Sequence, residues 1–199
     1  GTSEFVNQLA IAITTVIFNR SALLFAGEDG VAAVSIIMYL QFLCIGIYFG
    51  FSMGLSTPLG YAYGDRNFSV CRVLEKYAYR FFAIAPIILY GCTYLLTPIG
   101  VRFFASPGST VFNMAVSGMR LYGLGFLFSG INIFAAIRMM TYGKGYISGM
   151  ITFLRSFALL LLFLTVLPRF LELNGIWLAV PAAEILTLIV ALWTLRKKL

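Results

Sequence analysis

Six long apolar segments dominate this sequence of 199 residues and constrain its fold more than any other feature. A helix rises about 1.5 Å per residue, so roughly 20 apolar residues cross the ~30 Å hydrocarbon core of a bilayer. Inside lipid, only helices and closed barrels satisfy their own backbone polar groups. The sequence therefore predicts an all-α, polytopic membrane protein in which residues 1–199 form one bundle of six transmembrane helices. These helices are expected at about 5–26, 31–61, 81–104, 110–140, 146–167 and 175–195.

Composition excludes several classes of function. Apolar residues make up 61% and charged residues 11%, against about half and a quarter in soluble domains. The sequence has no histidine, which excludes a histidine-ligated metal site and a Ser–His triad. Cys44, Cys71 and Cys92 lie far apart without metal-ligand spacing and are expected to be reduced packing residues. We therefore expect neither an enzyme nor a metal protein.

Basic residues are distributed unevenly along the chain and predict its orientation in the membrane. One side carries few of them in its loops, namely Arg102 and Arg169. Loops that carry more Lys and Arg stay in the cytoplasm, so both termini are predicted to be cytoplasmic in a multi-pass protein of the plasma (inner) membrane. No basic face of a soluble domain is visible, so a nucleic-acid partner is not expected. The basic side carries Arg66, Arg72, Lys76, Arg80, Arg138, Lys144, Arg196, Lys197 and Lys198.

Residues 54–67, which read GLSTPLGYAYGDRN, close the second apolar segment. The string predicts a helix end that turns at Pro58 and Gly60 and opens into a basic loop. It resembles the glycine–proline–tyrosine–glycine signature at a helix end in multidrug and toxic-compound extrusion (MATE) transporters. The residues that carry this likeness are Gly54, Pro58, Gly60, Tyr61, Tyr63 and Gly64.

Three further strings extend the resemblance over nearly the whole chain. GFLFSGINIF lies in the fourth segment, ISGMITFLRSF in the fifth, and NGIWLAVPAAE opens the sixth. In this order they are similar to helices seven to twelve of a MATE transporter, which form its C-terminal lobe. The chain begins with Gly1 rather than methionine, which is typical of a fragment, a cut domain or a processed product.

The resemblance implies a function as half of a secondary active antiporter. In the family, two six-helix lobes rock about a central cavity and export drugs or organic cations in exchange for H⁺ or Na⁺. The implied partners are a missing N-terminal lobe, the lipid bilayer and a small organic cation, with no cofactor besides the coupling ion. One branch places coupling carboxylates in its seventh and tenth helices, and another uses a carboxylate in the missing lobe. Here the first segment has only Glu4, and 110–140 has no acid, so neither site carries over.

Placing a charged side chain within an apolar segment costs free energy in a bilayer, so each such residue is a candidate for a functional role. Glu184 and Arg155 lie at similar depths in neighbouring segments, so they can meet. A structural ion pair and an exchanging proton or cation site both remain open for them. Glu4, four residues before Gln8, is a third ion-coupling candidate, either as an acid that favours the helix dipole or as the rim of a cation pathway. Candidates for lining the cavity are Gln8, Asn19, Tyr39, Gln41 and Asn132.

Two other functions are compatible with the same pattern. A lipid-linked saccharide flippase of the same superfamily would need cations that face the cavity, and only Arg155 and Arg120 qualify. A non-transporting membrane scaffold would need no polar centre at all. Trp177 and Trp193, near opposite ends of the last segment, are expected in the interfacial aromatic belt.

Overall fold

The computed structural model describes the backbone of residues 2–196 and the side chains of residues 12–196. Every regular element in this part of the chain is helical, which confirms the all-α class. A 3-10 turn, η1 (Gly123–Gly125), joins α3 to α4, and a π-helical segment, η2 (Leu154–Ala158), joins α5 to α6. The α-helices are α1 (Thr2–Gly64), α2 (Phe68–Val101), α3 (Thr110–Tyr122), α4 (Phe126–Thr141), α5 (Gly145–Phe153), α6 (Leu159–Val166) and α7 (Pro168–Arg196).

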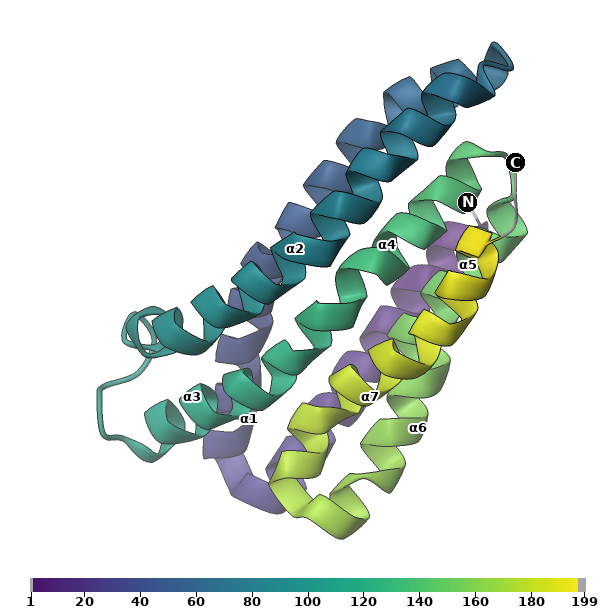
Figure 1. Ribbon diagram of the computed structural model, residues 1–199. Coiled ribbons are helices and arrows are strands. Elements are labelled where there is room, and N and C mark those ends of the chain that lie inside the picture. The colour runs from purple at the N-terminus through teal and green to yellow at the C-terminus, as the bar shows by residue number, and fades with distance from the viewer. Residues whose placement is uncertain (1, 197–199) are drawn as a thin grey trace.

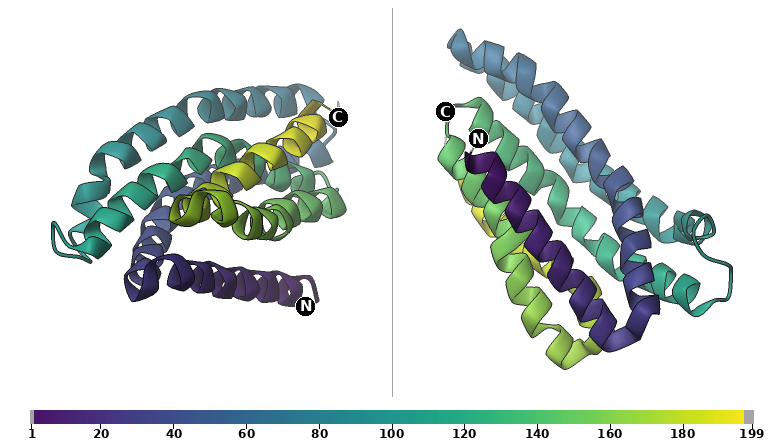
Figure 2. Two further views of the ribbon diagram at one scale, coloured as in Figure 1. Left: turned by 90° about the horizontal axis from the view of Figure 1, so that it is seen from below. Right: turned by 180° about the vertical axis from the view of Figure 1, so that it is seen from behind.

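Helix α1 consists of two arms that meet at Gly27 (Figure 2). The backbone of Gly27 has φ +63° and ψ −153°, a conformation that a side chain disfavours and that glycine adopts readily. The arms correspond to the helices predicted at 5–26 and 31–61. Five helices of the described chain are long and apolar enough to cross a membrane, and the first of them runs through this kink. The predicted six segments thus correspond to five such helices, because the first two are joined through Gly27 in one helix.

The turn between α1 and α2 differs from the prediction. Pro58 lies inside α1, which continues through Gly60 to Gly64. The chain reverses at residues 65–67, where Arg66 has φ +55° and the Asn67 side chain accepts a hydrogen bond from the Val70 amide at 3.3 Å. Proline removes only one hydrogen bond from a helix, and membrane helices tolerate it, so neither Pro58 nor Gly60 ends this one.

The third predicted helix, 81–104, begins much earlier, at Phe68. The predicted basic loop is therefore largely the first turns of α2, which carry Arg72, Lys76 and Arg80. Cys71, Glu75 and Ala78 bury the opposite face of these turns against the bundle. Hydropathy locates only the part of a helix that lies in lipid, so it missed the polar extension.

The remaining spans lie close to their predicted ranges. Helix α7 begins at Pro168 rather than near residue 175, and its first turns are separated from the rest by Glu172, with φ +50° and ψ −129°. A Cβ on Gly175 would lie 2.5 Å from the Leu167 carbonyl, so the tight connection from α6 to α7 requires glycine there.

The core surrounds α4, which contacts α1, α2, α5 and α7 (Figure 1). Trp177 is 1% exposed, which corrects the expectation that it lies in the aromatic belt. It packs against Gly118, where a Cβ would come within 2.8 Å of the indole. Trp193, by contrast, is exposed. Trp177 therefore fills space that glycine leaves open between α3 and α7.

The start of α1 and the end of α7 lie at the same end of the bundle (Figure 1). We call this the basic end, because it carries Arg66, Arg72, Lys76, Arg80, Lys144 and Arg196. The opposite end holds the Gly27 kink, the 102–109 loop and the break at Glu172.

Candidate functional site

Arg155 and Glu184 form a direct ion pair between η2 and α7. The Arg155 Nη2 atom lies 2.5 Å from Glu184 Oε1, and its Nε lies 3.1 Å from Oε1 and 3.3 Å from Oε2. The side chains are 11% and 5% exposed. The depth argument from the sequence thus predicted the pairing correctly. A forked arrangement of this kind both neutralises and orients the carboxylate.

Asn132, on α4, completes this polar centre. Its Nδ2 atom donates to Glu184 Oε2 at 2.7 Å and to the Glu184 backbone oxygen at 2.9 Å. Its Oδ1 atom is buried and has no hydrogen-bond partner in the described part of the chain. Leaving a buried acceptor unsatisfied costs about 1–3 kcal/mol. The centre therefore offers an unused acceptor oxygen beside a carboxylate.

The backbone around Arg155 is adapted to this position. Residues 154–158 form a π-helical turn, a rare conformation that is frequently found at functional sites. The Ser156 carbonyl in this turn accepts a hydrogen bond from Thr14 Oγ1, on the first arm of α1, at 3.5 Å. Through these two contacts, η2 binds α1 at the Ser156 carbonyl and α7 at the Arg155 side chain.

The other predicted site residues lie in different surroundings. Gln41 accepts a hydrogen bond from the Tyr122 hydroxyl at 2.6 Å, so it joins the second arm of α1 to α3. Asn19 lines a pocket of about 600 Å³ at the Gly27 kink. Tyr39 is exposed and stacks on Phe104 with 5.8 Å between ring centroids. The side chains of Glu4 and Gln8 lie outside the described residues.

A second buried ion pair, at the basic end, was missed by the sequence analysis. Arg138 Nε donates to Glu75 Oε1, which also accepts from the Tyr142 hydroxyl at 2.6 Å. The Arg138 Nη1 atom donates to the Thr194 carbonyl at 3.5 Å. Burial, followed by the hydrogen bond to Glu75, raises the pKa of Tyr142, so Tyr142 remains a donor. Arg138 was counted among the loop cations, whereas it is 2% exposed.

One sequence signal pointed to this pair. Glu75 is the only acid in the basic stretch 66–80, and it is four residues from Cys71, on the helix face that both residues bury. An acid on the apolar side of a basic helix requires a buried cation, and Arg138 is the one cation near the end of the fourth segment.

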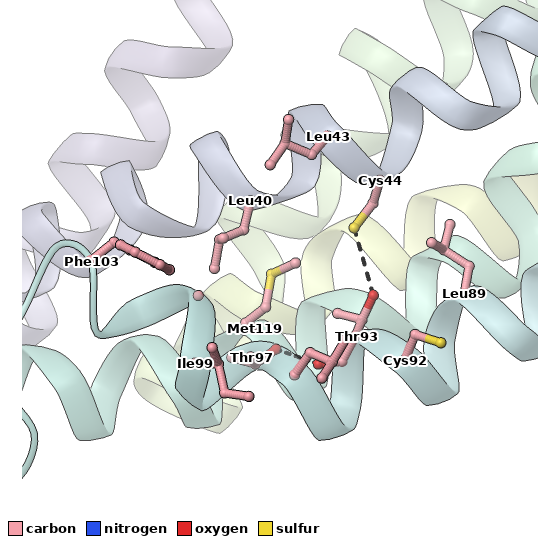
Figure 3. A pocket seen from close by; sticks show the side chains of 12 residues that line it. Leu40, Leu43, Cys44, Leu89, Cys92, Thr93, Thr97, Ile99, Phe103 and Met119 are labelled. Carbon is pink, nitrogen blue, oxygen red and sulfur yellow. Dashed lines mark hydrogen bonds between the residues drawn. The ribbon is translucent and has the colours of Figure 1, made fainter.

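An apolar pocket of about 340 Å³ lies between the second arm of α1 and α2 (Figure 3). Its walls include Leu40, Leu43 and Met119. Its polar atoms bond to each other, with Cys44 Sγ 3.6 Å from Thr93 Oγ1 and Thr97 Oγ1 donating to the Thr93 carbonyl at 2.5 Å. No charged side chain lines it, so it is separate from the polar centre. In the described part of the chain, no three His, Cys, Asp or Glu side chains gather as a metal site.

Comparison with known proteins identifies the family. The MatE family profile matches residues 5–167. The chain belongs to the MATE family. Its fold is similar to that of a multidrug resistance MATE family transporter of the MOP superfamily, both in the inward-facing structure (TM-score 0.87, 21% identity) and in the outward-facing one (TM-score 0.85, 22% identity). These results confirm the resemblance inferred from the motifs.

A MOP superfamily transporter from Pyrococcus furiosus, described as having a binding pocket of reverse polarity, is similar at TM-score 0.85 and 22% identity. The match covers 98% of this chain and 44% of that one. The chain thus spans less than half the length of these transporters, as a single MATE lobe does. No match was found among curated protein sequences.

Proposed function

We propose that this chain is one lobe of a secondary active antiporter that exports drugs or organic cations in exchange for H⁺ or Na⁺. The observation that carries the proposal is the Glu184–Arg155–Asn132 centre, buried at mid-span in a lobe of the MATE family. A buried ion pair is weak evidence for stability. Charged groups inside a membrane are costly and are most often functional.

The contacts support a competition mechanism at Glu184. Arg155 forms a forked ion pair with the carboxylate, and an entering ion must weaken that pair to bind. A proton neutralises the carboxylate directly. A sodium ion takes oxygen ligands, and the free Oδ1 of Asn132 is available beside the Glu184 carboxylate. Protonation or sodium binding would each weaken the Arg155–Glu184 pair, which joins η2 to α7. Ion binding is thereby coupled to movement between these two elements.

We propose that the second arm of α1 faces a second lobe. Phe42, Leu43 and Met53 on this arm are exposed. Gly46, Gly50 and Gly54 recur there at four-residue spacing, and a Cβ on any of them would meet nothing within 4 Å. Small residues at this spacing allow close approach of another helix. No described residue packs against these three glycines, so this face is available for a partner lobe.

The same contacts favour an antiporter over a lipid-linked saccharide flippase. Arg155 is engaged by Glu184, and the Arg120 guanidinium lies over the Tyr94 ring, 4.5 Å from its centroid. Arg155 is therefore not free to bind a pyrophosphate, and of the two cations only Arg120 has no carboxylate partner among the described residues. A scaffold would have no need for a buried charged centre, because apolar residues of equal volume are often at least as stable.

The test is efflux of a fluorescent organic cation from liposomes that contain the complete two-lobe transporter. Glu184→Gln should abolish efflux driven by either gradient while the protein remains folded and monodisperse. Glu75→Gln is the matched control, since it also removes one buried carboxylate charge. Normal efflux by a folded Glu184→Gln protein would exclude the coupling role.

We also propose that the basic end faces the cytoplasm of a plasma (inner) membrane, with both termini inside. The basic residues at this end support it. Single cysteines at positions 67 and 197 of a cysteine-free variant should react with an impermeant reagent only from the cytoplasmic side, and one at 107 only from outside. Labelling of position 107 from the cytoplasmic side alone would reverse the orientation.

A further inference from the structure

The first turns of α2 carry an ordered row of cations. Arg72, Lys76 and Arg80 lie four residues apart on a continuous helix, so they share one face. All three are exposed, and none forms an ion pair with a carboxylate in the described part of the chain. We call these three residues the α2 basic row. Arg66 extends it into the turn before the helix.

Glu75, the one acid among residues 66–80, lies on the side of the helix opposite the α2 basic row. Glu75 lies between Arg72 and Lys76 in sequence, but it is buried against Arg138 and Tyr142 on the other side of the helix. Its charge is thus neutralised internally. The exposed face keeps its positive charges, and Asp65, in the turn, is the nearest exposed acid along the chain.

The rest of α2 shows where the bilayer begins. Up to Arg80 the exposed cations alternate with exposed apolar and aromatic side chains such as Val73 and Tyr77. From residue 81 to residue 101 the helix has no charged residue, and its exposed side chains include Ile84, Ile87 and Leu95. From Ile84 to the exposed Phe103 the chain rises about 30 Å, which equals the thickness of a hydrocarbon core. The lipid boundary therefore falls between Arg80 and Ile84.

This boundary places Arg80 at the height of the lipid headgroups and Lys76 and Arg72 on the water side of them. At 1.5 Å per residue from Ile84, the three Cα atoms stand about 6, 12 and 18 Å outside the hydrocarbon core for Arg80, Lys76 and Arg72. Headgroups occupy roughly the first 5–8 Å on each side, and long basic side chains extend several ångströms toward them. The hairpin of α1 and α2 projects past the other helices at the basic end (Figure 1), so no other element covers the row.

We propose that the α2 basic row binds the phosphate headgroups of anionic phospholipids in the leaflet at the basic end. Charge complementarity and the position of Arg80 in the headgroup layer select this occupant, with Lys76 and Arg72 attracting the same surface from further out. Each cation near an anionic surface contributes by long-range attraction that fades within a Debye length of about 8 Å. The contribution therefore falls in the order Arg80, Lys76, Arg72.

The experiment measures lipid selectivity of the chain in membranes of phosphatidylcholine with one fifth phosphatidylglycerol. Spin-labelled lipids report the association constant of phosphatidylglycerol relative to phosphatidylcholine at the protein surface. The triple variant Arg72→Gln/Lys76→Gln/Arg80→Gln should lower this ratio about fivefold or more. Among the single variants, Arg80→Gln should lower it most. The variant Arg72→Lys/Arg80→Lys, which keeps the charges, should retain the wild-type ratio.

The matched control removes three exposed cations at the opposite end, in Arg20→Gln/Arg102→Gln/Arg169→Gln. It should retain most of the selectivity, and unchanged thermal unfolding of both triple variants excludes a folding defect. Equal losses in the two triple variants would overturn the proposal, because the effect would then follow net charge alone. So would an unchanged ratio in the α2 triple variant, or recovery of a bound protein in place of lipid. Equally strong displacement by inorganic phosphate would also contradict a lipid site.

Discussion

The part of this lobe that the structure describes holds two buried ion pairs, which have similar burial but different surroundings. Arg155–Glu184 lies at mid-span, with 11% and 5% of the side chains exposed, and Arg138–Glu75 lies at the basic end, with 3% and 9% exposed. The mid-span pair keeps an unsatisfied acceptor at its side, Asn132 Oδ1. In the basic-end pair, Tyr142 supplies a second donor to the carboxylate and Thr194 an acceptor for the guanidinium.

This contrast indicates different roles for the two pairs. The basic-end pair joins α2, α4 and α7. Its further hydrogen bonds, to Tyr142 and to the Thr194 carbonyl, hold these helices together. The mid-span pair joins η2 to α7 through a π-helical turn and leaves a place for another ligand. A buried network whose hydrogen bonds are all made favours rigidity. The mid-span network leaves Asn132 Oδ1 without a partner among the described residues, so this oxygen can still accept a ligand. We therefore expect the lobe to be held together at the basic end and to respond to ions at mid-span.

Arg155→Met should have the largest effect on stability. It leaves the Glu184 carboxylate at mid-span with Asn132 as its donor, and breaking a buried ion pair in this way costs about 3–5 kcal/mol. The free energy of unfolding in mixed micelles measures the loss. The double variant Arg155→Met/Glu184→Gln should recover most of it, because no unpaired charge remains. A single variant as stable as the wild type would contradict the pairing.

Arg138→Met should cost less, roughly 2–3 kcal/mol, because the Glu75 carboxylate keeps the Tyr142 hydroxyl and lies near water at the end of the bundle. The same unfolding assay measures it. Transport by the complete transporter should change only in proportion to the amount of folded protein. A loss of turnover per folded molecule would show that the basic-end pair is more than structural.

The sequence predicted the fold and the mid-span pair for the same reason. Glu184 and Arg155 are isolated charges with apolar residues on both sides, so they are easily recognised in the sequence. Their similar depths in neighbouring helices are enough to predict that they pair. Glu75 lies in sequence among Arg72, Lys76 and Arg80, and a charged stretch of this kind predicts a solvent-exposed loop. Its burial depends on the helical start of α2 at Phe68, which hydropathy does not detect. Likewise, the break at Gly27 was predictable, because residues 27–30 read GEDG, which is typical of a turn. The π-helical turn at Arg155 has no such sequence signature.

Tyr142→Phe sharpens the comparison at the basic end. It removes one donor to Glu75 while Arg138 still neutralises the charge, so we expect a loss of roughly 1–2 kcal/mol in the free energy of unfolding. If Arg138 and Tyr142 act on the same carboxylate, the effects of their variants should not add, with a coupling energy of about 0.5–3 kcal/mol in a double-mutant cycle. Strict additivity would mean that the two donors stabilise the lobe independently.

Asn132→Leu should have the smallest effect on stability and therefore gives the cleanest separation of structure from function. It removes the Nδ2 donor to Glu184, but it also removes the unsatisfied Oδ1 atom, so the net loss should be about 1 kcal/mol or less. Arg155 remains to neutralise the carboxylate. If Oδ1 is a ligand for a coupling ion, sodium-driven efflux by the complete transporter should fall far more than this stability change explains. Proton-driven efflux, which needs only the Glu184 carboxylate, should persist. Equal loss under both gradients would assign Asn132 to holding Glu184 in place rather than to binding the ion.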